Sequence, residues 1–244
     1  GLYERIPTNR HAARTQPEWP QALGEEPLSD PRLDKLKPRD GRVQLGTLGR
    51  GNHFVELQRD EADRLWLMVH SGSRGLGQAI ANFHLVQADL SGGLPSLDAA
   101  DSPGRAYLHD AAWAERYAFA NRLAMVQAVA DLLSAEFSIT CDWATLIHES
   151  HNHVRRETHL DRELLVHRKG AHPAAEGQPG LIPGSMGTCS FHVCGRGATE
   201  SLRSSSHGAG RALSRSEARR RIGQRQLERE MSGIWFDARR GDGL

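Results

Sequence analysis

The chain has 244 residues, of which 38% are apolar and 25% are charged, a composition typical of a globular protein with a buried core. Its formal net charge is only +1, so a nucleic-acid site would have to come from local clusters of arginine. No apolar run reaches the roughly 18 residues that span a bilayer, and no signal-peptide pattern is found. We therefore expect a cytoplasmic protein without a membrane partner.

The cysteines argue against disulfide bonds, whereas the histidines suggest a metal site. The three cysteines, Cys141, Cys189 and Cys194, are an odd number without paired spacing, which argues against a disulfide framework. We expect Cys189 and Cys194 to be small buried residues. Thirteen histidines, several beside Gly, Ser or Asn, indicate that imidazoles could converge on a metal.

Residues 1–40 are expected to form an extended or loop-rich segment, because they contain six of the 11 prolines and no sustained hydrophobic period. Residues 41–244 would then form the main domain. Its short strands, long helices and glycine-rich loops predict an α+β fold with a strand-rich central core and flanking helices.

The first glycine-rich turn leads through Asn52 and His53 into a short strand that ends near Leu57. Because side chains alternate along a strand, His53 would face one side while Asn52 and Glu56 face the other. One face could offer a metal ligand and the other a polar contact to a nucleobase or phosphate. The alternative is a histidine at a strand edge with no function.

A second glycine-rich loop follows the apolar strand Leu65–Val69. It reads His70-Ser71-Gly72-Ser73-Arg74-Gly75 and opens a helix predicted to continue to about residue 88, an arrangement that directs backbone N–H groups at anions. It is not a P-loop, since no Gly-Lys-Ser/Thr follows at the required spacing. We predict a phosphate-facing loop, with a plain tight turn as the alternative.

The longest predicted helix covers residues 111–137, after a polar linker at 91–104. Apolar residues recur every three or four positions and predict one buried stripe; they are Leu123, Val126, Ala130, Leu133 and Phe137. The aromatic residues Trp113, Tyr117 and Phe119 are expected to lie in the core.

Three histidines fall within residues 147–153, in a strand or irregular loop. Their spacing lacks the helical His-Glu-x-x-His pattern of zinc proteases. We predict one metal ligand, His151, beside an amide donor, Asn152, with His148 and His153 as bystanders.

A strand predicted at Glu163–His167 is followed by a loop rich in glycine and hydroxyls, Ile182–Ser190. Backbone amides and hydroxyls of such a loop could wrap a nucleotide while Met186 packs on an apolar face. The alternative is an ordinary type II turn at Pro183-Gly184.

His207 lies between hydroxyl and other small residues, within Ser204-Ser205-Ser206-His207-Gly208-Ala209-Gly210-Arg211. Glycines let the backbone approach a ligand, and successive N–H groups suit anionic oxygens. This favours phosphate chemistry with His207 as nucleophile, although such a histidine can also be purely structural.

A capping box at Ser214–Glu217 opens a helix predicted to continue to about residue 230. Its arginines could contact an RNA backbone or form a solvated face; they are Arg215, Arg219, Arg220, Arg221 and Arg225.

Taken together, the motifs from about residue 40 onward resemble the RtcB-type RNA-splicing ligases. They occur in the family's order: Gly51-Asn52-His53-Phe54-Val55-Glu56, His70-Ser71-Gly72-Ser73-Arg74-Gly75, His151-Asn152, Arg168-Lys169-Gly170-Ala171, Pro183-Gly184-Ser185-Met186-Gly187 and His207-Gly208-Ala209-Gly210-Arg211.

The resemblance implies an enzyme that joins RNA ends bearing a 3′-phosphate or 2′,3′-cyclic phosphate to 5′-hydroxyl ends, using GTP and two Mn²⁺ ions. His207 would carry GMP as a phosphoramidate. The implied metal ligands are His53, His70 and His151. The implied GMP-site residues are Asn52, Glu56, His151, Asn152, Pro183, Gly184, Ser185, Met186, Ser190, His207, Gly208, Ala209 and Gly210.

Two features of the family are missing from the chain. None of the three cysteines has Asp three residues before it, although the family carries a metal-bridging Asp-x-x-Cys, and the chain ends in Gly241–Leu244 rather than a guanylate-contacting lysine. We expect a fragment of a longer protein, whose activity could also need an accessory activator. The alternatives are a non-catalytic RNA-binding remnant and a manganese-dependent phosphodiesterase.

Overall fold

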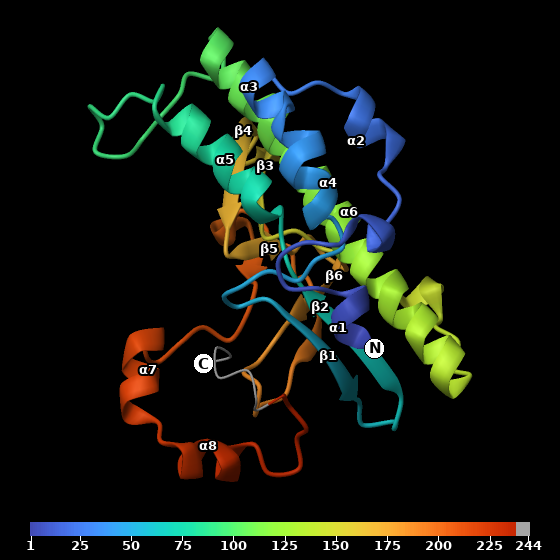
Figure 1. Cartoon of the computed structure of the whole chain (residues 1–244). Coiled ribbons are helices and arrows are strands. Elements are labelled where there is room, and N and C mark those ends of the chain that lie inside the picture. Colours follow the sequence, from blue (N-terminus) through green and yellow to red (C-terminus); the bar gives the residue numbers. More distant parts are fainter. Residues whose placement is uncertain (238–244) are drawn as a thin grey trace. The chain divides into compact units, whose positions relative to one another are not determined.

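The computed structural model describes residues 1–237, so the terminal segment Gly241–Leu244 and the side chain of Arg215 lie outside the described part. Helices and strands are both present throughout this part (Figure 1), which is compatible with the predicted α+β class. The chain divides into two compact units, Gly1–Leu146 and Ile147–Leu244, called here the N-terminal and C-terminal units.

The N-terminal unit begins with short helical turns joined by loops. They are α1 (Leu2–Arg5), η1 (Ala13–Thr15), α2 (Gln21–Glu25), α3 (Pro31–Asp34), η2 (Lys37–Gly41) and α4 (Arg42–Gln44). Proline and capping residues explain their starts: at α3, Asp30 accepts a 2.7 Å hydrogen bond from the Arg32 amide, and Pro31 occupies the first turn. Leu23, Leu28 and Leu33 from this stretch are buried in the unit's core.

The longest element is α6 (Ser102–Phe137), against which α5 (Arg74–Leu85) and α1 pack (Figure 1). It starts nine residues before the predicted residue 111, so the expected linker at 91–104 overlaps its first turn. The reason is Pro103, which lacks the N–H that a first helical turn leaves unpaired and is therefore well suited to that position.

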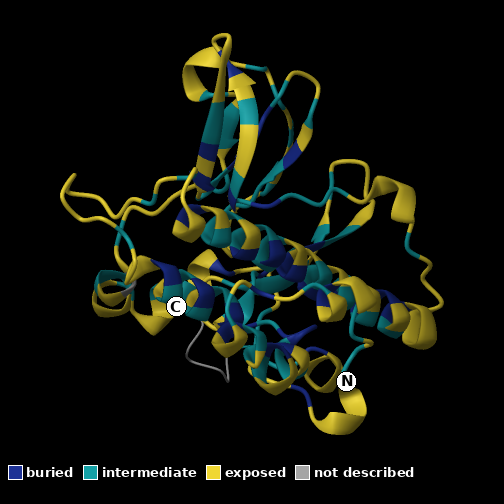
Figure 2. Cartoon of the chain, turned by 90° about the horizontal axis from the view of Figure 1, so that it is seen from above, coloured by how far each residue is buried: buried dark blue, intermediate teal, exposed yellow. Residues whose placement is uncertain are grey.

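The buried stripe of α6 recurs every four residues, at Trp113, Tyr117, Asn121, Met125 and Val129. The predicted stripe is only partly correct: Ala130 and Leu133 are buried, whereas 38% of Leu123 and 67% of Phe137 are exposed. Phe119, predicted in the core, is 41% exposed. Figure 2 shows the buried residues, in dark blue, recurring along this helix.

The error in phase has a physical cause, because the buried stripe includes a polar residue. Asn121 is fully buried; its Oδ1 accepts from the Thr47 amide at 3.1 Å, and its Nδ2 donates to the Ser71 hydroxyl and the Gly72 carbonyl. Burying an amide is tolerated only where it is hydrogen-bonded in this way. A buried stripe predicted from hydrophobicity alone therefore does not include Asn121.

A β-hairpin completes the N-terminal unit. Strand β1 (Phe54–Arg59) pairs antiparallel with β2 (Leu65–His70), with Phe54 opposite His70. Both strands were predicted within two residues of their observed bounds, and α5 follows β2 as expected. A short 3₁₀ turn, η3 (Trp143–Thr145), lies near the end of the unit.

The C-terminal unit contains three antiparallel strand pairs among its described residues. They are β3 (Asn152–His159) with β4 (Arg162–Lys169), β5 (Ala171–Pro173) with β8 (Ser204–Ser206), and β6 (Pro179–Ile182) with β7 (Phe191–Cys194). The turn between β3 and β4 has positive φ at Leu160 and Asp161, the backbone that a tight two-residue hairpin requires.

The arginine-rich segment forms two helices rather than one. These are α7 (Arg215–Arg221) and α8 (Gln224–Glu230), and Gly223 lies between them. Ser214 accepts a 3.2 Å hydrogen bond from the Glu217 amide and so caps α7 as predicted. A turn, η4 (Thr199–Ser201), precedes β8.

Cys189 and Cys194 are exposed, so the prediction of buried cysteines is wrong. Both lie in or beside the short strand β7, whose residues are exposed or only half-buried. In residues 1–237, every helix is either too short or too polar to cross a membrane.

Candidate functional site

Two of the predicted metal ligands lie together in the N-terminal unit. His53 and His70, at the paired start of β1 and end of β2, have ring centroids 5.9 Å apart. The Nδ1 atom of His53 lies 2.8 Å from the Leu48 carbonyl oxygen and, because a carbonyl only accepts, carries the proton. His70 stacks on Phe54 at 5.5 Å, and its Nε2 lies 3.4 Å from the Asn52 amide nitrogen.

Asn52 lies beside His70 just before β1, and Glu56 lies within β1. Asn52 is exposed, whereas Glu56 is half-buried, and burial raises the pKa of the Glu56 carboxyl against the opposing effect of a hydrogen bond from Gln58. The third residue of β1 thus carries a carboxyl group whose ionisation is disfavoured by burial.

The glycine-serine loop after β2 bonds mainly to the unit itself. Ser71 donates to the Leu48 carbonyl at 2.7 Å, and Arg74 donates to the Thr47 hydroxyl and the Thr8 carbonyl. The Gly75 amide donates to the Gln44 side chain at 3.0 Å. These contacts hold the loop in place, and the phosphate-facing role stays a prediction.

The closest convergence in the C-terminal unit is that of His151 and His207, whose ring centroids are 4.4 Å apart. Gly170, between β4 and β5, joins both residues: its amide donates to the His151 carbonyl at 2.8 Å, and its carbonyl lies 2.7 Å from His207 Nδ1. Gly170 has φ +75°, and a Cβ there would lie 3.3 Å from His207 Cε1. Only glycine meets both requirements without strain.

The contact with Gly170 determines which nitrogen of His207 can react. A carbonyl oxygen only accepts, so the hydrogen bond places a proton on Nδ1, and the neutral ring keeps its lone pair on Nε2. Strand β8 ends at Ser206, directly before His207, and the β5–β8 pairing brings His207 to Gly170.

The two small-residue loops of the predicted GMP site are joined by a hydrogen bond from the Ala209 amide to the Pro183 carbonyl, 3.1 Å. The Gly184 amide donates to the Ser190 hydroxyl, and the Ser185 amide donates to Thr188 at 2.7 Å. Met186 is 42% exposed, and its packing on an apolar face stays a prediction.

The alternative of a type II turn at Pro183-Gly184 is wrong. That turn requires positive φ at its third residue, and Gly184 is not among the glycines with positive φ in the described part of the chain. Gly210, by contrast, has φ +78°, which supports the predicted glycine-dependent turn after His207.

Two residues for which the sequence predicted no functional role contact each other in the C-terminal unit. His153, predicted to be a bystander, is buried and lies 3.3 Å from the guanidinium of Arg168, which is itself only 4% exposed. The signal was in the strand alternation: Arg168 follows Val166 by two residues in β4, so both lie on the buried face.

The implied metal ligands are drawn from both units, since His53 and His70 lie in the first and His151 in the second. Within residues 1–237, no group of three or more metal-binding side chains is assembled. A close histidine pair lies within each unit, His53 with His70 in the first and His151 with His207 in the second.

Comparison with known proteins identifies the family. A family model described as "tRNA-splicing ligase RtcB" matches residues 10–242. The RNA-splicing ligase RtcB of Escherichia coli strain K12 is 44% identical over 235 residues, which cover 90% of this chain and 56% of that protein. RNA-splicing ligase RtcB1 of Escherichia coli strain ATCC 25922 gives the same values. The chain spans just over half the length of these relatives, and it belongs to the RtcB family.

Proposed function

We propose that the protein is a GTP- and manganese-dependent RNA ligase that works through a guanylate carried on His207. The observation that carries the proposal is the hydrogen bond between His207 Nδ1 and the Gly170 carbonyl, 2.7 Å. It fixes the tautomer in which Nε2 is the nucleophilic atom. Family membership and 44% identity to RNA-splicing ligases support the same chemistry.

In this proposal Nε2 of His207 attacks the α-phosphorus of GTP, forming a P–N bond as pyrophosphate leaves. The guanylate then passes to the 3′-phosphate oxygen of one RNA end, and His207 returns to its neutral form. The 5′-hydroxyl oxygen of the second RNA attacks this activated phosphate, loses its proton, and displaces GMP. The substrates are thus an RNA with a 3′-phosphate and one with a 5′-hydroxyl; a 2′,3′-cyclic phosphate end would first be opened by water, which breaks the P–O2′ bond and leaves the 3′-phosphate.

The histidine pairs fit manganese, because imidazole is an acceptable ligand for this ion and a ring whose Nδ1 donates to a carbonyl keeps its Nε2 lone pair for the metal. His53 meets this condition through Leu48. His53, His70 and His151 would hold the two ions, which when bound would neutralise the triphosphate and polarise phosphoryl oxygens.

The remaining predicted residues would contact GMP. In the N-terminal unit these are Asn52 and Glu56; in the C-terminal unit they are Asn152, Pro183, Gly184, Ser185, Met186, Ser190, Gly208, Ala209 and Gly210. The hydrogen bond between the Ala209 amide and the Pro183 carbonyl supports this assignment, because it holds the two loops of the second group together.

Exposed arginines of α7 and α8 would contact the RNA backbone; Arg219, Arg220, Arg221 and Arg225 are all exposed. Neutralising phosphates in this way makes binding fall with salt concentration. An accessory activator and a cytoplasmic location belong to the same proposal.

The test is to incubate the protein with Mn²⁺ and GTP labelled on the α-phosphate, then to measure acid-labile label on the protein. We expect label on the unchanged protein and none on His207→Ala. His167→Ala is the matched control, since it removes an exposed histidine of β4, and it should retain the label.

Other outcomes identify the alternatives. Label that persists in His207→Ala contradicts the nucleophile assignment. RNA binding without any adduct indicates a non-catalytic RNA-binding remnant. Cleavage of phosphodiesters that needs Mn²⁺ but no GTP indicates a phosphodiesterase.

A further inference from the structure

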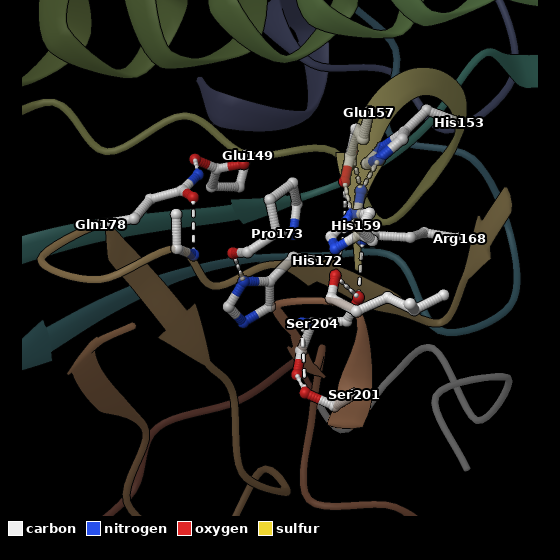
Figure 3. Close-up of polar contacts among 12 residues, drawn as sticks. Glu149, His153, Glu157, His159, Arg168, His172, Pro173, Gln178, Ser201 and Ser204 are labelled. Carbon is white, nitrogen blue, oxygen red and sulfur yellow. Dashed lines mark hydrogen bonds and ion pairs between the residues drawn. The ribbon is translucent and has the colours of Figure 1, made fainter. Parts of the chain in front are cut away.

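A buried arginine forms an ion pair near the segment that leads to His207. Arg168 of β4 is 4% exposed and contacts Glu157 of β3 through both terminal nitrogens, at 2.5 and 2.9 Å. Figure 3 shows the pair together with His153, His159 and Ser204. A buried guanidinium is costly unless its charge and its N–H groups are all paired.

The hydrogen bonds of Arg168 account for all five of its N–H donors. Nε donates to the Ser204 hydroxyl at 2.8 Å, and one terminal nitrogen donates to Glu157 and to His153 Nε2. The other terminal nitrogen donates to Glu157 and to the Leu202 carbonyl at 3.0 Å. Arginine accepts no hydrogen bond, so His153 must accept through Nε2 and is neutral in this arrangement.

Glu157, the acidic partner of Arg168, also forms several hydrogen bonds. The Glu157 carboxylate accepts from both Arg168 nitrogens and from His159 Nε2 at 2.8 Å. These contacts, with that to Arg168 the largest, lower the pKa of Glu157 to about 2. The carboxylate is therefore charged throughout the range in which a neutral histidine could act as a nucleophile.

Two N–H groups of Arg168 donate to a strained turn that precedes His207, the proposed nucleophile. Leu202 and Arg203 both have φ +50°, a left-handed conformation that is disfavoured for residues other than glycine. Arg168 bonds to the Leu202 carbonyl on one side of this turn and to Ser204 on the other. The contacts of Arg168 thus hold the backbone in the conformation that starts β8.

Strand β8 is too short to fix its own register, since it makes three residue pairs with β5, from Pro173↔Ser204 to Ala171↔Ser206. A slip of one residue would move His207 by about 3.3 Å. A shift of that size would break the 2.7 Å hydrogen bond between His207 Nδ1 and the Gly170 carbonyl oxygen. The hydrogen bond therefore depends on the contacts that hold the start of β8 in place.

We propose that Arg168, held by Glu157, is a positioning residue for His207: it clamps the Leu202–Ser204 turn and so sets the register that brings His207 Nδ1 to the Gly170 carbonyl. This role rests on the proposed function only for its catalytic consequence. Lysine cannot replace arginine here, because one ammonium group cannot contact Glu157, Ser204 and Leu202 in the same planar geometry.

The test compares Arg168→Lys with Arg162→Lys, which keeps the same substitution on an exposed residue of the same strand. The first readout is the ¹H–¹⁵N spectrum of histidine-labelled protein without nucleotide, which distinguishes Nδ1–H from Nε2–H tautomers. The second is the rate of guanylate transfer to the protein from labelled GTP.

We expect a single Nδ1–H tautomer for His207 in the unchanged protein and in Arg162→Lys, and a mixed tautomer in Arg168→Lys. Guanylate transfer should fall about 100-fold in Arg168→Lys, the order of loss for a reacting group displaced by about 1 Å. Should Arg168→Lys fail to fold, Ser204→Ala removes one clamp contact and is expected to show the same change of tautomer with about a tenfold slower transfer.

An unchanged His207 tautomer with transfer within twofold of normal, in either variant, overturns the role of Arg168. A tautomer change confined to the Arg168 and Ser204 variants supports the clamp even if no variant, nor the unchanged protein, forms an adduct. That last result would instead contradict the proposed function, so the two failures are distinguishable.

Discussion

The contact that matters most at the scale of single residues is that of Gly170 with His207. The sequence predicted a functional role for His207 and none for Gly170, and the structure places His207 Nδ1 2.7 Å from the Gly170 carbonyl oxygen. Arg168 belongs to a motif that resembles the family, but its burial was not predicted, because charged side chains are rarely buried. The residues that pair with it, Glu157, Leu202 and Ser204, lie 11 to 36 positions away in the chain. Only the alternation of side chains along β4 indicated that Arg168 is buried.

Replacing Gly170 with alanine should disturb both the backbone and the nucleophile. We expect a loss of roughly 1–2 kcal/mol in the free energy of unfolding, because alanine is disfavoured at φ +75°, and a loss of guanylate transfer, because the new Cβ lies 3.3 Å from His207 Cε1. Urea unfolding and the labelled-GTP assay measure the two effects.

Gly177→Ala is the matched control, since Gly177 also has φ +75° but an added Cβ would meet nothing within 4 Å. It should show a similar loss of stability with normal guanylate transfer. Equal loss of transfer in both variants would show that backbone strain alone is responsible, and not the contact with His207.

The pH dependence of stability should report on Glu157. Its pKa is lowered from 4.5 to about 2, so its contribution is present above pH 4.5 and is lost as the pH falls from 4.5 towards 2. The difference in unfolding free energy between the unchanged protein and Glu157→Gln should be constant from pH 7 to 5 and then shrink. A difference that does not change between pH 5 and 2.5 would contradict the ion pair.

At the scale of elements, α6 shows what hydrophobic pattern predicts and what it misses. The pattern correctly predicted a long helix and the burial of Trp113 and Tyr117. It missed the start at Ser102 and the phase of the buried face, because Asn121 occupies that face and its partners, Thr47 and Ser71, come from loops far away in sequence. Capping, a local signal, was read correctly at Ser214.

Asn121→Ala should therefore destabilise the N-terminal unit. It leaves the buried amide of Thr47 without its 3.1 Å acceptor, which costs about 1–3 kcal/mol for an unsatisfied buried donor. The measurement is urea unfolding. Asn82→Ala on α5 is the control, since its side chain is exposed, and it should change stability by less than about 0.5 kcal/mol. Equal stability of the two variants would contradict the anchoring role of Asn121.

At the scale of the whole molecule, the sequence predicted the family and the α+β class, but it did not predict the division after Leu146. That division depends on packing between elements distant in sequence, which motifs do not encode. Residues 1–40 illustrate the same limit: a loop-rich segment was expected, and Leu23, Leu28 and Leu33 within it are part of the core formed with α5 and α6.

The central claim of the proposed function is that the protein carries guanylate on His207. After incubation with GTP and Mn²⁺, peptide mass spectrometry at neutral pH should locate one guanylyl group per chain on His207, with a ³¹P resonance typical of a phosphoramidate. A guanylyl group on a lysine or serine, or a protein that remains unmodified while it joins RNA ends, would contradict the account.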